Sequence, residues 1–77
     1  MLKRLEAKGR RERSARLWRA AELFTEGKLE ESLKELEAIL NRDPDDAEVL
    51  YNMGLAYAKM GRYKEAIERL KRVIARF

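Results

Sequence analysis

The sequence predicts an all-α protein of two stacked helix–turn–helix hairpins, preceded by a basic N-terminal helical extension. Three observations favour this fold class. Ala, Leu, Glu, Lys and Arg dominate the 77 residues, a composition typical of long or idealised helices. Apolar residues recur at helical spacing almost throughout the chain. A shift of 34 residues places one half of the chain on the other, which is the period of a helix–turn–helix repeat.

The composition excludes several classes of site. The chain has no cysteine and no histidine, which removes disulfides, thiolate metal sites and the side chain that titrates nearest neutral pH. No apolar run approaches the length of a membrane span, and the start MLKRLEAKGRRERSAR lacks the apolar core of a secretory signal. We expect a cytoplasmic protein if the chain is natural, and a synthetic protein otherwise.

Residues 1–14 fit neither half of the repeat and form the predicted basic extension, whereas residues 15–77 form the repeat domain. The first 20 residues hold eight Lys or Arg against two Glu, a net charge of +6, and the rest of the chain carries −2. Two interpretations stay open. The segment continues the first helix, or it breaks at Gly9, because GRRERSARLW resembles GKLEESLKEL after a shift of 18 residues.

Turn residues set the predicted helix boundaries. Gly27 and Gly61 suit the left-handed position just past a helix end. Pro44 cannot continue a helix, and we expect Asp45 to cap the third helix, which begins after NRDPDDAE, with Glu48 completing a capping box. The apolar faces of the four helices are, in order, Leu17, Ala20, Ala21 and Phe24; Leu29, Leu33, Leu36, Ile39 and Leu40; Leu50, Met53, Leu55 and Tyr57; and Ile67, Leu70, Val73, Ile74 and Phe77.

The repeat explains why a predicted helix contains Gly54 in its interior. The 34-residue shift places Ala20 on Gly54 and Ser32 on Ala66, so small residues occupy matching places in both hairpins. Small residues let paired helices approach closely, and we expect Gly54 to make room for a neighbour's side chain. The aromatic residues Trp18, Tyr51, Tyr57 and Tyr63 are predicted to lie mostly in the core or between helices.

Residues 47–77 resemble a tetratricopeptide repeat, and residues 16–44 resemble a second copy more loosely. The family pattern appears at Leu50, Met53, Gly54, Tyr57, Ala66 and Leu70, and again at Ala20, Leu23, Gly27, Ser32, Leu36 and Pro44. Arg16 and Arg19 depart from it, because they stand where the family buries Trp and Leu. The apolar face of the first helix is therefore rotated from that of the family.

The resemblance implies a concave groove that binds peptides, lined by the first helix of each repeat. The matching positions here are Leu17, Ala21, Phe24, Tyr51, Asn52, Leu55 and Lys59. Asn52 matches an asparagine that often holds a peptide. Leu17 and Ala21 replace lysines of the carboxylate-binding members, so the resemblance implies a hydrophobic peptide or another copy of this chain as the ligand.

No residue pattern predicts an enzyme, a cofactor or a metal site. The glutamates of residues 30–37 are spread around a helix with nothing apolar to perturb their pKa values. The DPDD segment lacks the 12-residue loop of a calcium hand, and the hydroxyl side chains have no histidine to activate them.

The predicted function is therefore protein–protein interaction without catalysis. The leading hypothesis is a designed or idealised chain that self-associates into a symmetric homo-oligomer, with a dimer favoured, because stacks of this kind need about three repeats and this chain has two. Its self-association face is Ile67, Leu70, Ile74 and Phe77. The absence of Gln, His and Cys supports a designed origin, although proteins of hyperthermophiles share such a composition.

Two alternatives remain. One is a natural module or fragment that binds a hydrophobic peptide in the groove. The weaker one is a nucleic-acid-binding helical protein that uses the arm residues Arg10, Arg11 and Arg13. No aromatic residue before Trp18 would stack on bases, and the arm can equally pair with an acidic protein surface.

Overall fold

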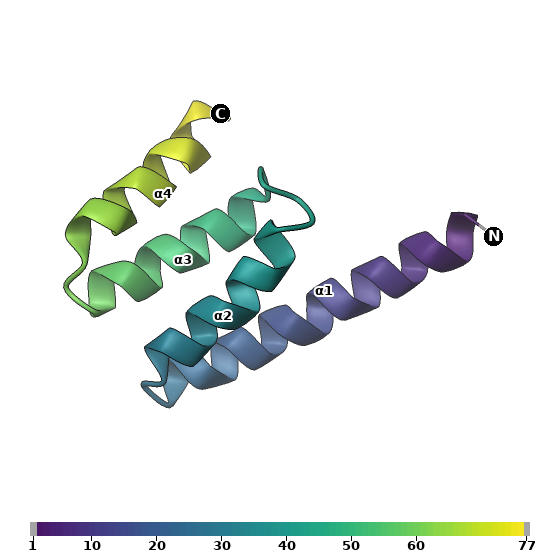
Figure 1. The fold of residues 1–77 in the computed structure, drawn as a ribbon, viewed down its shortest axis with the longest axis horizontal. Helices are drawn as coiled ribbons and strands as arrows, with labels where there is room; N and C mark the ends of the chain where they lie inside the picture. The colour runs from purple at the N-terminus through teal and green to yellow at the C-terminus, as the bar shows by residue number, and fades with distance from the viewer. Residues whose placement is uncertain (1, 77) are drawn as a thin grey trace.

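Four helices follow one another along the chain and form two antiparallel hairpins (Figure 1). The computed structural model describes residues 2–76, with side chains from residue 9 onward. The helices are α1 (Leu2–Thr25), α2 (Leu29–Leu40), α3 (Ala47–Lys59) and α4 (Tyr63–Ala75). α1 packs on α2, α2 on α3 and α3 on α4, and no strand occurs in the described residues, so the predicted all-α class is confirmed.

α1 is one helix that continues through Gly9, and its N-terminal end projects past the other three helices (Figure 1). Of the two open interpretations, the structure has the continuous helix. The division of the chain after residue 14 stays a prediction, as does any role of Phe77, which lies outside the described residues. No helix in the described part of the chain is both long and apolar enough to cross a membrane.

The two hairpin turns have the same geometry, 34 residues apart. Both Gly27 and Gly61 have φ of +80°, as predicted for residues just past a helix end. The N–H of Gly27 donates to the Phe24 carbonyl at 3.0 Å, and the N–H of Lys28 donates to the Leu23 carbonyl at 2.8 Å. The same two bonds recur at the second turn, at 3.0 and 2.9 Å. Each turn therefore satisfies the last carbonyls of its helix.

Gly54 lies where α3 and α4 approach most closely. A Cβ atom at this position would sit 2.8 Å from both Cγ and Cδ2 of Leu70, and 3.5 Å from the Ala66 carbonyl oxygen. The expectation that Gly54 makes room for a neighbour's side chain is confirmed. In the first hairpin, Ser32 Oγ donates to the Ala20 carbonyl oxygen at 2.8 Å, so the small residues there also bring two helices together.

The core lies between the helices of both hairpins, with the inner pair α2 and α3 contributing most of it. The buried apolar side chains are Ala20, Leu23, Leu33, Leu36, Ile39, Val49, Leu50, Met53, Ala56, Tyr57 and Ala66. Tyr57 is buried as predicted, but Tyr63 is exposed on α4 and the core assignment was wrong for it. Tyr63 follows the turn at Gly61 directly, on a face of α4 that no described helix covers.

Asp46, and not Asp45, caps α3. Its side chain accepts a hydrogen bond from the Val49 N–H at 3.3 Å, and α3 begins at Ala47, inside the segment predicted to precede it. The prediction was wrong by one residue because the backbone N–H of Asp45 bonds to Asp43 Oδ1 at 3.3 Å, which places Asp45 in the preceding turn. Glu48 is therefore not the third helical residue, and no capping box forms.

Candidate functional site

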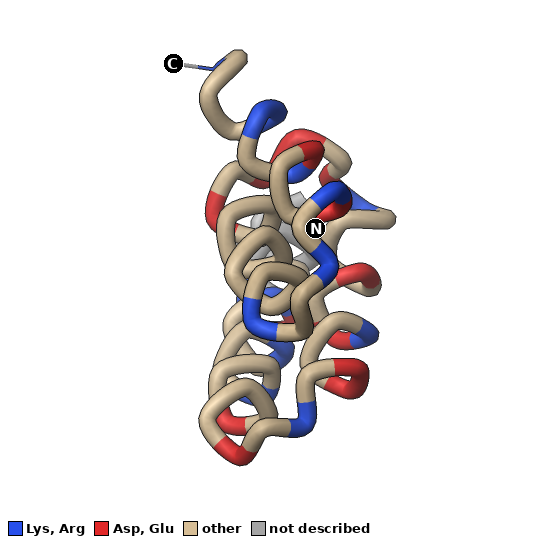
Figure 2. Tube along the Cα trace, turned by 90° about the vertical axis from the view of Figure 1, so that its left-hand side faces the viewer, with Lys and Arg blue, Asp and Glu red and all other residues tan. Residues whose placement is uncertain are grey.

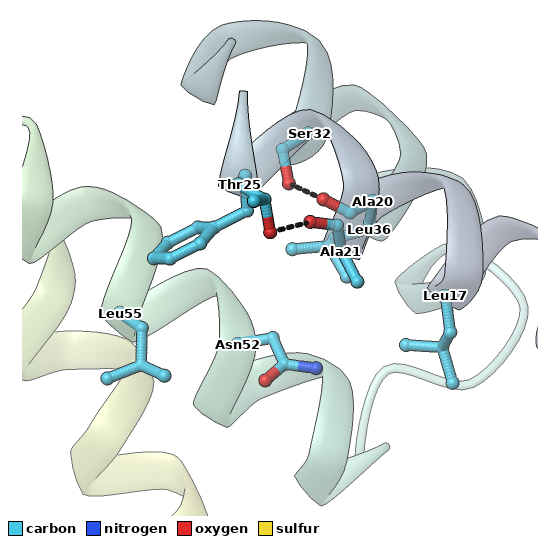
Figure 3. Close-up of a pocket in the computed structure, with 9 residues that line it drawn as sticks. Leu17, Ala20, Ala21, Thr25, Ser32, Leu36, Asn52 and Leu55 are labelled. Atoms are coloured by element: carbon cyan, nitrogen blue, oxygen red, sulfur yellow. Dashed lines mark hydrogen bonds between the residues drawn. The ribbon is translucent and has the colours of Figure 1, made fainter. Parts of the chain in front are cut away.

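A pocket of about 190 Å³ opens between α1 and α3, the first helices of the two hairpins (Figure 3). Its lining comes from three helices: Leu17, Ala20, Ala21, Phe24 and Thr25 of α1, Ser32 and Leu36 of α2, and Asn52 and Leu55 of α3. Five of the seven predicted groove residues are among them. Tyr51 and Lys59 lie on α3 but do not line the pocket.

The pocket wall is apolar because its hydroxyl groups are already bonded to backbone. Ser32 Oγ donates to the Ala20 carbonyl oxygen at 2.8 Å, and Thr25 Oγ1 donates to the Ala21 carbonyl oxygen at 3.0 Å (Figure 3). Asn52 differs, since its amide group extends into the pocket and no hydrogen bond joins it to the other residues drawn there (Figure 3). The site is therefore an apolar pocket with one amide available to a ligand.

Lys59 ties the far end of α3 to α1. Its Nζ atom lies 4.7 Å from the centre of the Phe24 ring, a cation–π contact between the two hairpins. Phe24 in turn is half-buried against the core. This contact holds one wall of the pocket in place across the concave side.

Trp18 is the residue near the pocket that sequence analysis missed. It was predicted as a core or packing residue, yet 73% of its surface is exposed, so that prediction was wrong. Trp18, Ala21, Glu22, Thr25 and Glu26 line a second, shallower depression of about 360 Å³, which shares Ala21 and Thr25 with the pocket. The 34-residue shift could have indicated this position, because it places Trp18 on Asn52.

Arg13 ties α1 to the start of α3. Its Nε lies 2.8 Å from Asp46 Oδ2, and its Nη2 lies 3.1 Å from Asp46 Oδ1 and 2.9 Å from Glu48 Oε1. The hydrogen bonds from Arg13 lower the pKa of the Asp46 carboxyl, against the opposing effect of burial, and the Val49 N–H lowers it further. Asp46 is only 8% exposed, so this ion pair is the most enclosed one among the described residues.

Two more ion pairs join the first half of α1 to the rest of the molecule. Glu12 Oε2 lies 2.7 Å from an Arg42 guanidinium nitrogen, and Arg16 Nη1 lies 3.3 Å from Glu35 Oε2. Arg16 thus meets a carboxylate at a position where the family buries an apolar residue. Acidic and basic positions are interspersed along the chain trace, which makes such pairs frequent (Figure 2). Of the three predicted arm residues, Arg10 and Arg11 are exposed, whereas Arg13 is held inside the molecule's own network.

A second apolar surface lies on α4. Ile67 is 52% exposed and Ile74 is 72% exposed, with exposed Tyr63 one turn before them. Leu70, between the two isoleucines, is half-buried against Gly54. We call Tyr63, Ile67, Leu70 and Ile74 the α4 stripe, since their spacing of four, three and four residues keeps them on one side of the helix.

The tetratricopeptide repeat family matches residues 23–77, which is more than half of the chain. The chain therefore belongs to the tetratricopeptide repeat family. Members of this family are protein–protein interaction modules with protein or peptide partners, and they are typically not catalytic. The match begins at Leu23, so Arg16 and Arg19, the residues that depart from the repeat pattern, lie outside it. No curated protein matches the chain.

Proposed function

We propose that this chain is a non-catalytic binding module whose groove between α1 and α3 takes an apolar segment of a peptide. The observation that carries the proposal is the apolar pocket with its one unsatisfied amide. Pockets for whole small molecules measure about 300–1,000 Å³. The pocket here, at about 190 Å³, is smaller and suits one or two side chains of a peptide.

Two contacts would hold the peptide. An apolar side chain in the pocket would lie against Leu17, Phe24 and Leu55, and burial of such a side chain contributes about 1.5–3 kcal/mol. The Asn52 amide has both a donor and an acceptor, so it can pair with a peptide group of the ligand that would otherwise lose its hydrogen bonds to water. Apolar burial would supply affinity, and Asn52 would fix the direction of the backbone.

A random dodecapeptide library displayed on phage tests this proposal. We expect sequences with a large apolar residue to be enriched on the wild-type protein and to lose binding to Leu55→Arg, because the arginine places a charge in the pocket wall. Ile67→Arg is the matched control, since it adds the same charge on the exposed face of α4 and should retain binding. Far-ultraviolet circular dichroism checks that both variants stay helical. No enrichment, or binding that survives Leu55→Arg, would overturn the assignment.

Self-association into a homo-oligomer is the second candidate, and the α4 stripe favours it. The 34-residue shift places Leu33 and Leu36, which are buried, on Ile67 and Leu70. α3 covers this face of the first hairpin, whereas no described helix covers it in the second. Apolar surface of this kind commonly marks an interface.

A second copy would cover the stripe with its own α4 more readily than with α1. The residues of α3 that pack inward include Met53 and Ala56, and the matching positions of α1 carry Arg19 and Glu22, both exposed. α1 therefore lacks the apolar face with which α3 packs against α2. Pairing of two α4 helices about a two-fold axis closes on itself and gives a discrete dimer, whereas head-to-tail stacking would not close.

The remaining proposals rest on less. An idealised or designed origin is supported by the composition, with no Gln, His or Cys. Nucleic-acid binding by the arm loses support because Arg13 and Arg16 already pair with carboxylates of this chain.

A further inference from the structure

The groove does not end at the apolar pocket. The depression lined by Trp18, Ala21, Glu22, Thr25 and Glu26 continues it along the outer edge of α1, and the shared residues Ala21 and Thr25 are the border between the two. An extended peptide that fills the pocket with one side chain can therefore place a neighbouring side chain in this depression. We call Trp18, Glu22 and Glu26 the Trp18 ledge.

The exposure of Trp18 is the first reason to expect a ligand there. An indole is the largest apolar side chain, and this one leaves most of its surface in water while the neighbouring Leu17 packs against the core. Exposed tryptophans are enriched in binding sites, because a rigid aromatic surface gains much contact area at little cost in conformational entropy.

The charges around Trp18 indicate which side chain would bind. Glu22 and Glu26 follow Trp18 at intervals of four residues, so the three side chains lie along one line of α1. Glu26 has an exposed partner, Lys28, at 3.5 Å, and pairs of that kind contribute little. Glu22 makes no ion pair with another residue of the described part of the chain. The face of an indole ring attracts cations, and two carboxylates beside it add to that attraction.

We propose that the Trp18 ledge binds the cationic side chain of an arginine, or less well a lysine, in the same peptide whose apolar side chain enters the pocket. Arginine is favoured because its planar guanidinium stacks on an aromatic ring while its N–H groups reach a carboxylate. The ligand is thus a peptide with one apolar and one basic residue close together. This inference rests on the proposed groove function and specifies its ligand.

Short Gly/Ser peptides with one Leu and one Arg, separated by one to four residues, test this inference. Each has a twin in which citrulline, neutral but nearly identical in shape, replaces Arg. Trp18 is the one tryptophan of the chain, so its fluorescence reports binding at the ledge directly. At low salt we expect the best Arg peptide to bind about 2–30-fold more tightly than its citrulline twin, the range that cation–π contacts span, and its advantage to shrink at high salt.

Matched variants locate the effect. Glu22→Gln with Glu26→Gln should reduce the advantage of Arg over citrulline, whereas Glu30→Gln with Glu31→Gln, which removes the same charge from the exposed side of α2, should leave it unchanged. Trp18→Leu, measured by calorimetry, should abolish it. Equal binding of the twins, sensitive to Leu55→Arg, would overturn the ledge but keep the groove. Absence of binding by both twins would overturn the groove and the ledge together.

Discussion

Each of the four glycines stands in this chain for its own local reason. Gly27 and Gly61 have positive φ angles at the two turns. Gly54 has no room for a Cβ because Leu70 occupies that space. Gly9 lies in α1 with nothing within 4 Å of where its Cβ would be. The same substitution to alanine should therefore have opposite effects at Gly54 and Gly9, both of which are helical.

Gly54→Ala should lower the free energy of unfolding by about 1 kcal/mol, since overpacking costs about 1–3 kcal/mol and helix propensity returns up to about 1. Gly9→Ala should instead raise the helical circular dichroism signal, because it gains about 0.5–1 kcal/mol of propensity without a clash. Urea unfolding followed by circular dichroism measures both. A Gly54→Ala variant more stable than the wild type would show that the two helices do not need this close approach.

At the scale of elements, the ion pairs of α1 decide how the first hairpin meets the second. α1 has charged residues where a repeat of this family has apolar ones, and Arg13 compensates by binding Asp46 at the start of α3. One carboxylate thus caps α3 and anchors α1. The stability that this pair contributes must depend on pH, because the pKa of Asp46 is lowered in the folded protein.

Arg13→Gln should lower the free energy of unfolding at neutral pH by about 1 kcal/mol, a value reduced for the 37% exposure of Arg13. A lowered folded-state pKa contributes stability that is present above the ordinary aspartate pKa of about 3.9 and is lost as the pH falls below it. The difference between wild type and variant should therefore be constant near neutrality and shrink toward pH values under about 4. Arg11→Gln, exposed on the same helix, is the control. A difference that grows in acid would refute the role of Asp46.

The sequence was sufficient for the repeat but not for these contacts. The 34-residue period predicted the hairpins, both turn glycines and the close approach at Gly54, because each depends on residue size or φ angle at a fixed spacing. The Arg13–Asp46 pair joins residues of different repeats that occupy unlike positions, so no period indicates it. Trp18 was misassigned for a related reason: large apolar residues are usually buried, and only the rotation of the α1 face leaves this one outside.

At the scale of the whole molecule, the α4 stripe predicts how association responds to salt. Lys64 and Lys71 each follow a stripe residue and border the stripe on one side. Two α4 helices paired about a two-fold axis would bring these lysines of both copies near one another, and salt screens such repulsion. We therefore expect the dimer fraction, measured by light scattering after size exclusion, to rise with NaCl, and the melting temperature to rise with protein concentration.

Ile67→Lys should abolish this association while leaving the helical signal intact, and Lys28→Glu, at an exposed position away from α4, should not. A protein that stays monomeric at high concentration and high salt would exclude the two-fold α4 dimer. That result would leave the groove assignment untouched, because the groove and the stripe share no residue.

Amide NMR of the labelled protein, titrated with an apolar peptide enriched in the library selection, tests the groove assignment most directly. The groove assignment predicts chemical-shift changes centred on Leu17, Asn52 and Leu55, with only small changes along α4. The side-chain amide of Asn52 should shift as strongly as any backbone signal, because it would bond to the peptide. Shift changes confined to Ile67, Leu70 and Ile74, with Asn52 and Leu55 unmoved, would contradict the groove as the binding site.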